Sequence, residues 1–136
     1  MKKLSLLSSF PKSKRNLKER NVNKNNIKVA LKYSKEYFDG TREQGYGGYY
    51  YDGRWVNIAR KLIKLFKLKN GSKFLDIGCA KGFLIHDLKI ILPNLKIYGI
   101  DISQYAKKNS ILNVRKNIKI MNCKKLNYKN FFFDGL

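Results

Sequence analysis

The sequence predicts an α/β fold, in which a parallel sheet alternates with helices and follows a cap of helices and glycine- and tyrosine-rich chain. Two observations lead to this prediction. Short apolar segments that end at polar turns alternate with segments of helical periodicity in the second half of the chain. Strands that alternate with helices need crossover connections, which make the strands parallel. The length of 136 residues suffices for one domain with a modest core.

Four strands are expected in this half of the chain. They are residues 73–77, 96–101, 117–121 and 131–136. The first connecting helix is expected from about Ala80 to Leu92, because Pro93 cannot continue it. Ser103 is expected to cap a second helix that runs to about Val114. The fourth strand opens with three phenylalanines, which is typical of a strand buried on both faces.

Three units are expected along the chain. Residues 1–28 are rich in Lys, Asn and Ser without a sustained period, which predicts a basic, mobile arm. Residues 29–70 are expected to hold helices at 29–38 and 55–66, with a glycine- and tyrosine-rich loop between them. Residues 71–136 are expected to form the sheet domain.

The glycine- and tyrosine-rich loop is the second unusual stretch of the sequence. Its glycines preclude a regular helix, while its tyrosines and Trp55 supply large apolar faces with polar tips. Two interpretations are equally open. The loop either folds over a ligand or packs as an aromatic loop on the domain.

The chain carries a formal net charge of +21, from 30 basic and 9 acidic residues. Such a charge is typical of proteins that bind nucleic acid or other anions. Lysine far outnumbers arginine, however, and the lysines are spread along the chain. Lys, Asn and Ile share AT-rich codons, so genome composition can supply much of this charge. Nucleic-acid binding is therefore the less favoured alternative.

The remaining composition predicts a cytoplasmic protein without a metal site. No apolar run approaches the length of a membrane span, and the N-terminal residues make a poor signal peptide. Cys79 and Cys123 do not form a CxxC pair, which disfavours a disulfide framework or a zinc site. His86 has no second histidine with which to bind a metal. The oligomeric state does not follow from the sequence.

The turn after the first strand reads Asp76-x-Gly78-x-x-x-Gly82. Gly78 lets the backbone pass close to a bound group, and Gly82 lets the next helix pack closely. A dinucleotide-binding turn needs G-x-G-x-x-G, but Asp76 and Lys81 stand at two of its glycine positions. The acid at the first position suits the ammonium of an amino-acid group better than a pyrophosphate.

Two further strand ends supply places for an adenosine. Asp101 ends the second strand, and its carboxylate can accept hydrogen bonds from both ribose hydroxyls. Ile102 offers an apolar face to the adenine. After the third strand, the Asn122 side chain can accept from the adenine amino group, and the Cys123 backbone N–H can donate to a ring nitrogen. The three sites, in order along one β-α-β-α-β run, predict binding of S-adenosylmethionine.

These motifs resemble those of the class I S-adenosylmethionine-dependent methyltransferases. The resemblance rests on Phe74-Leu-Asp-Ile-Gly-Cys-Ala-Lys-Gly-Phe83, Tyr98-Gly-Ile-Asp-Ile-Ser103, and Asn122-Cys-Lys-Lys-Leu-Asn-Tyr128 followed by Phe133-Asp134. It covers roughly residues 30–136. The cofactor-binding residues that the motifs and the resemblance imply are Asp76, Gly78, Cys79, Ala80, Gly82, Asp101, Ile102, Asn122 and Cys123.

Two positions depart from the usual pattern of this family. Ala80 stands where a middle glycine is common, and Asn122 stands where Asp is common. The second change keeps an acceptor atom but loses a charge. Asp134 falls where the family often places a residue near the reactive methyl group, and the catalytic residues are otherwise unknown.

The resemblance implies a Rossmann-like sheet of seven strands, of which this chain would supply about four. The expected function is methyl transfer from S-adenosylmethionine to an unidentified, small-molecule acceptor, with this chain supplying the cofactor-binding half. A truncated, N-terminal part of an enzyme, inactive by itself, is one expectation. The alternatives are a non-catalytic fragment that binds the cofactor or a partner, and an RNA methyltransferase or RNA-binding protein.

Overall fold

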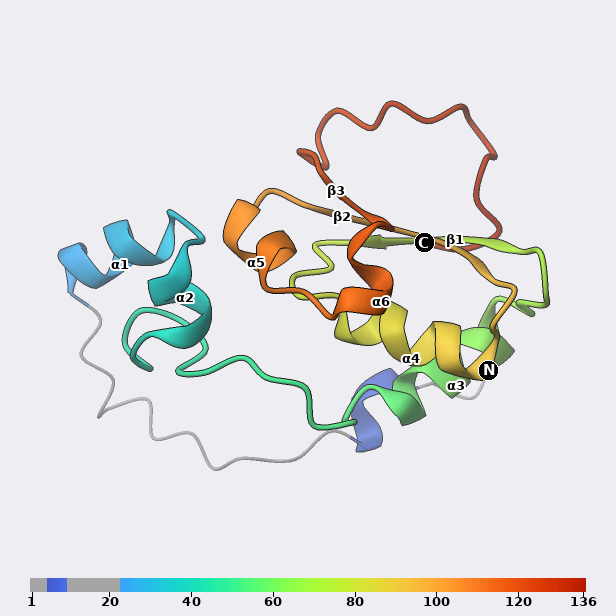
Figure 1. Ribbon diagram of the computed structural model, residues 1–136, viewed down its shortest axis with the longest axis horizontal. Coiled ribbons are helices and arrows are strands. Elements are labelled where there is room, and N and C mark those ends of the chain that lie inside the picture. The colour runs from blue at the N-terminus through green and yellow to red at the C-terminus, as the bar shows by residue number, and fades with distance from the viewer. Residues whose placement is uncertain (1–4, 10–22) are drawn as a thin grey trace.

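A three-stranded parallel sheet forms the centre of the protein (Figure 1). The computed structural model describes residues 5–9 and 23–136. The strands are β1 (Lys73–Ile77), β2 (Lys96–Asp101) and β3 (Ile118–Ile120), in the order β1-β2-β3. This confirms the predicted α/β class, because each pair of neighbours runs parallel and is joined by helices.

The prediction of a fourth strand through the three phenylalanines is wrong. Phe131–Phe133 lie outside the sheet, and pairing with β1 begins only after them. The Asp134 N–H donates to the Lys73 carbonyl at 2.8 Å, and the Leu75 N–H donates to the Gly135 carbonyl at 3.0 Å. These bonds give an isolated parallel bridge on the free side of β1 rather than a strand.

One face of the sheet is covered by α3 (Val56–Leu65), α4 (Phe83–Ile91) and α6 (Leu112–Arg115) (Figure 1). The apolar face of α3 lies against α4, as its helical spacing predicts. The buried side chains of this core come from the sheet, from all three helices and from the turns between them: Ile58, Ala59, Leu62, Leu68, Phe74, Cys79, Ile85, Leu88, Leu95, Ile97, Val114 and Ile118.

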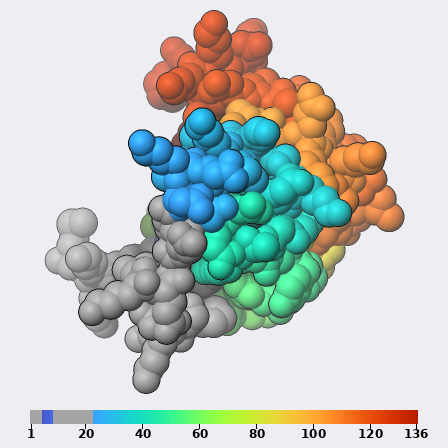
Figure 2. Space-filling model, turned by 90° about the vertical axis from the view of Figure 1, so that its left-hand side faces the viewer, coloured from blue at the N-terminus to red at the C-terminus, as the bar shows by residue number. Residues whose placement is uncertain are grey.

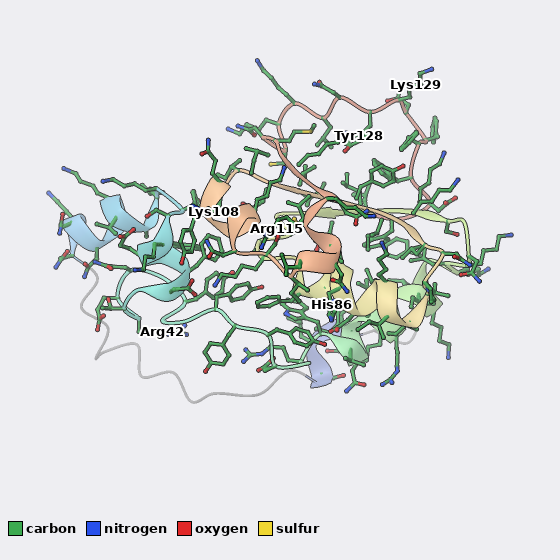
Figure 3. The ribbon with its side chains drawn as sticks, in the orientation of Figure 1. Arg42, His86, Lys108, Arg115, Tyr128 and Lys129 are labelled. Atoms are coloured by element: carbon green, nitrogen blue, oxygen red, sulfur yellow. The ribbon has the colours of Figure 1, made fainter. Side chains whose placement is uncertain are left out.

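The loop 121–133 crosses the opposite face of the sheet and carries Tyr128 (Figure 3). Three aromatic rings of this loop surround Tyr98 of β2. The ring centroids of Tyr128, Phe132 and Phe133 lie 6.1, 5.8 and 5.4 Å from that of Tyr98. Phe132 and Phe133 therefore cover the sheet beside Tyr98 and are partly buried there, whereas Phe131 is fully exposed.

The N-terminal elements are η1 (Leu6–Ser9), α1 (Lys24–Ala30) and α2 (Lys35–Asp39). The arm expected at 1–28 falls largely on residues outside those described. Within it, η1 lies against α3, where Lys61 Nζ donates to the Ser8 hydroxyl at 2.6 Å. The helix expected at 29–38 is interrupted, because Tyr33 adopts a left-handed φ of 48° between α1 and α2.

The second predicted connecting helix is also divided. Ser103 caps α5 (Gln104–Lys108) as expected, since its hydroxyl accepts from the Ala106 N–H at 3.0 Å. The chain then leaves the helix before α6 begins. The Ile111 N–H donates instead to the Lys81 carbonyl at 3.2 Å. A contact to the turn after β1 thus replaces helical hydrogen bonding.

Gly99 of β2 lies where the turn after β1 crosses the sheet. A Cβ atom at this position would stand 2.8 Å from Cys79 Sγ and 3.1 Å from Ile85 Cδ1. Real Cβ atoms essentially never show the first of these distances and rarely show the second, so a larger residue must displace the Cys79 side chain. The glycine therefore fixes how closely the turn packs on the strand.

Gly99→Ala is expected to lower the free energy of unfolding by about 1–3 kcal/mol, because the added methyl group overfills this contact. Chemical denaturation of the single variant measures the loss. The double variant Gly99→Ala/Cys79→Ala is the control, since removal of Sγ makes room for the methyl group. Its loss should be smaller than the sum of the two single losses. Additive losses would contradict the packing argument.

Candidate functional site

A cavity of about 370 Å³ opens at the carboxyl edge of the sheet, between the strand ends and α2. Its floor consists of the ends of β1 and β2 with the segments that follow them, and its roof consists of aromatic side chains from the N-terminal part. The lining residues are Tyr33, Tyr37, Phe38, Tyr46, Ile77, Gly78, Ala80, Ile100, Asp101, Ile102, Met121 and Cys123.

The end of β2 holds the turn after β1 in place. The Ile100 carbonyl accepts from both the Gly78 N–H at 2.8 Å and the Cys79 N–H at 3.1 Å. One residue later, Asp101 Oδ2 accepts from the Ala80 N–H at 2.8 Å. Three successive amides of the turn are therefore fixed by two residues of the neighbouring strand.

The two glycines of the turn have different roles. Gly78 has a φ of 77°, and a Cβ atom there would meet nothing within 4 Å, so the backbone faces open space. Gly82 has a φ of 78°, and a Cβ atom there would come within 3.0 Å of Ile118 Cδ1. Ala80 also adopts a left-handed φ, of 49°. Because of these left-handed residues, α4 begins at Phe83 rather than at the expected Ala80.

Two carboxylates meet at this edge, one from each strand. Burial, and then the charge of Asp101, raises the pKa of the Asp76 carboxyl from its ordinary value of 3.8 to about 6. Asp101 is better supported, because Oδ1 accepts from the Ser103 N–H at 2.8 Å and Oδ2 from the Ala80 N–H. Each of its oxygens keeps a further lone pair for a ligand.

Five of the residues predicted from sequence line the cavity. They are Gly78, Ala80, Asp101, Ile102 and Cys123. Ile102 is half exposed there, as an apolar wall for a bound ring requires. The predicted convergence of the first two strand ends is thus present in the structure.

Four of the predicted residues do not line the cavity. Asp76 lies in β1 and Gly82 in the turn that follows it, with the environments described above. The Cys79 side chain points into the core, where burial raises the pKa of its thiol. Asn122 is exposed, and its side-chain oxygen already accepts from the Lys124 N–H at 2.9 Å. The structure therefore gives neither of the last two side chains a contact with the cavity.

Asp134 also lies away from the cavity. Its carboxylate accepts from the Lys73 N–H at 2.7 Å, at the start of β1. The cavity lies beyond the other end of that strand. The expectation that Asp134 lies near a reacting group is therefore wrong for this structure, because pairing with β1 places it at the opposite edge of the sheet.

The sequence pointed to the tyrosine-rich loop but did not predict which of its aromatic residues form the roof of the cavity. We define the aromatic cap as residues 33–49. Tyr37, Phe38 and Tyr46 of the cap line the cavity, while Tyr49 stacks on Phe83 at 4.7 Å. Part of the tyrosine-rich loop thus lines the cavity and part of it packs on the domain, while its role as a cover over a ligand stays a prediction. Figure 2 shows the cap (cyan to blue-green) on this face next to α1 (blue), with the loop 121–133 (red) above it and orange segments of the sheet domain beside it.

Metal and disulfide chemistry find no support in residues 5–9 and 23–136. No group of three or more His, Cys, Asp or Glu side chains in these ranges could hold a metal ion. Cys79 and Cys123 are both free thiols. In the same part of the chain, no helix has the length and apolar character needed to cross a bilayer.

Comparison with known proteins places the domain in a family. Residues 68–134 match a family model described as a methyltransferase domain. A 62-residue segment is 40% identical to a probable cobalt-precorrin-6B C(15)-methyltransferase (decarboxylating) from Methanosarcina mazei. That segment is 46% of this chain and 31% of the relative, so the chain matches about a third of the relative's length.

Three solved structures are similar to parts of the chain. Coclaurine N-methyltransferase, bound to N-methylheliamine and SAH, is 17% identical with a TM-score of 0.45, over 63% of this chain and 25% of that protein. A SAM-dependent methyltransferase from Aquifex aeolicus is 28% identical with a TM-score of 0.37, over 46% and 36%. The plantazolicin methyltransferase BpumL, in complex with SAH, is 17% identical with a TM-score of 0.45, over 79% and 45%.

The family match spans β1, β2, β3 and the segments between them. These elements carry the sequence motifs, including Asp76 and Asp101. Residues 68–134 therefore form a methyltransferase domain, and the match is consistent with the class I S-adenosylmethionine-dependent methyltransferase family.

Proposed function

We propose that the cavity binds S-adenosylmethionine and that the chain supplies the cofactor-binding half of a methyltransferase whose acceptor is a small molecule. One observation carries the proposal. The turn after β1 and the Asp101 carboxylate converge on one cavity, within a domain that matches the methyltransferase family. The name of the curated relative, which is that of a precorrin methyltransferase, supports a small-molecule acceptor.

The residues at the cavity fit this cofactor. Its volume of about 370 Å³ lies in the range of small-molecule sites. Gly78 leaves open space where a side chain would otherwise project, so a ligand can approach the backbone. Asp101 keeps one lone pair on each oxygen for the two ribose hydroxyls. Ile102, Met121 and Cys123 are positioned to form the wall for the adenine.

Asp76 is the candidate partner for the ammonium of the methionine part. Its carboxylate is poorly solvated, and a cationic group beside it would relieve both the burial and the repulsion from Asp101. S-adenosylmethionine supplies a methyl group on a positively charged sulfur when bound. The residues of this chain hold and orient the cofactor, and the cavity walls exclude water from it.

The two free cysteines are consistent with a reducing compartment, and we propose a cytoplasmic location on that basis.

Asp101→Ala is expected to weaken binding of S-adenosylhomocysteine by about 10- to 100-fold, the loss typical of hydrogen bonds to a charged group. Titration calorimetry of the whole chain measures it. Asp101→Asn tests the same point with the side-chain shape preserved, because an amide has only one acceptor oxygen. Asp52→Ala is the matched control, since the Asp52 carboxylate is paired with Arg54 in a loop outside the cavity lining. Failure of the unchanged chain to bind, or full affinity in both Asp101 variants, would remove the proposal.

Affinity for S-adenosylhomocysteine is expected to fall about tenfold between pH 7 and pH 5, because Asp76 with a pKa of about 6 must be ionised to pair with the ammonium. Asp76→Asn should bind more weakly at pH 7 and show a flatter pH profile. An unchanged pH profile in this variant would assign the titration to another group.

The stability of the unliganded chain should respond in the opposite sense. The folded protein favours protonated Asp76, so this residue stabilises the fold at low pH and loses that effect as the pH rises from about 4 through about 6. Asp76→Asn should therefore raise the free energy of unfolding at pH 7 more than at pH 4. Chemical denaturation at the two pH values measures the difference, and equal effects at both would contradict the assigned pKa.

A further inference from the structure

Lys81 is a buried lysine in the turn after β1, and its ammonium group contacts the aromatic cap. Only 7% of the residue is exposed. Its Nζ donates to both oxygens of Asp39, each at 2.7 Å, and to the Tyr49 carbonyl, also at 2.7 Å. All three N–H donors of the ammonium are therefore used, and every acceptor belongs to the cap.

Asp39 receives further hydrogen bonds around this ion pair. The Tyr105 hydroxyl of α5 donates to Oδ2 at 2.8 Å, and the Tyr49 N–H donates to Oδ1 at 3.1 Å. Burial acts to raise the pKa of the Asp39 carboxyl, but the bonds from Lys81 and Tyr105 outweigh it and hold the pKa below its ordinary value. The carboxylate is thus ionised. Asp39 itself is partly exposed, but its partner Lys81 is buried, so loss of Asp39 would leave a buried charge unpaired.

The ion pair lies directly behind the cavity. Asp39 follows Phe38, and Lys81 follows Ala80. Phe38 and Ala80 both line the cavity, and they pack together with Ala106 in one buried cluster. Because each charged residue is adjacent in sequence to a lining residue, the pair fixes the separation of the cap wall from the turn wall.

Hydrogen bonds within the cap close residues 37–48 into one loop around Asp39. The Tyr46 N–H donates to the Tyr37 carbonyl at 2.8 Å, and the Gly48 N–H donates to the Phe38 carbonyl at 3.1 Å. Arg42, which Figure 3 places at the outer side of the cap, donates to the Tyr46 carbonyl at 2.7 Å. The position of Asp39 is therefore coupled to the positions of the roof tyrosines.

We propose that Lys81 is a positioning residue for the cofactor: through its ion pair with Asp39 it holds the aromatic cap over the cavity, and so slows release of the bound adenosyl ligand. This inference rests on the proposed function of the cavity. It assigns a binding role to residues 33–49, which precede the matched methyltransferase domain at 68–134.

The test compares Lys81→Met, Asp39→Asn and the double variant in calorimetric binding of S-adenosylhomocysteine to the whole chain. Each single variant is expected to lose about 10- to 100-fold in affinity, the loss typical when a supporting residue behind a site is removed. Asp39→Asn also leaves the buried Lys81 charge without its counter-charge, so it should lower the unfolding midpoint. The double variant removes both charges, so its unfolding midpoint should recover while its affinity stays low.

Lys61→Met is the matched control. Lys61 also joins two elements through its Nζ, but it ties η1 to α3 and does not line the cavity. Its affinity should equal that of the unchanged chain. Hydrogen exchange of residues 37–48 gives a second measurement, since their amides should exchange faster in Lys81→Met, in Asp39→Asn and in the double variant, but not in Lys61→Met.

Three results would overturn the inference. The double variant would bind as tightly as the unchanged chain if the single losses came from instability alone. Asp39→Asn would keep full affinity if Lys81 acted on the ligand directly. Unchanged affinity in Lys81→Met would remove any role for the residue. Failure of the unchanged chain to bind S-adenosylhomocysteine is a separate result, because it would remove the proposed function itself.

Discussion

The site depends first on how the end of β2 holds the turn after β1. The Ile100 carbonyl and the Asp101 carboxylate accept from three successive amides, those of Gly78, Cys79 and Ala80. Each amide would otherwise lie at a strand end without a ladder partner. This arrangement closes the turn into a left-handed path, exposes Gly78 to the cavity and starts α4 at the correct distance from the sheet. The same carboxylate then faces the cavity, so one side chain builds the turn and lines the site.

The cost of that arrangement is electrostatic. The parallel strands bring Asp76 and Asp101 to the same edge, where burial and mutual repulsion oppose ionisation of Asp76. A fold selected for stability alone would not place two carboxylates here. Such a poorly solvated acid at a cavity is typical of a site built for a charged ligand, because the ligand supplies the missing counter-charge.

The aromatic cap solves a different problem, that of enclosing the cavity. Its tyrosines contribute apolar faces to the roof, but aromatic packing alone leaves the cap free to slide over the turn. Lys81 and Asp39 add a charged, directional contact immediately behind the lining residues Ala80 and Phe38. The cap and the matched domain thus line one cavity, although the family match covers only the second of them.

The sequence by itself determined the features that depend on local pattern. Alternating apolar segments located β1, β2 and β3, the glycine spacing located the turn, and Ser103 was identified as a helix cap because its partner lies three residues away. Tertiary structure decided the rest. Phe132 and Phe133 became a cover for Tyr98, since ring packing outweighed strand propensity. Asn122 bonded to its own turn, and Cys79 turned into the core. Lys81 found its partner 42 residues away, and no local pattern can indicate a contact that only the folded chain creates.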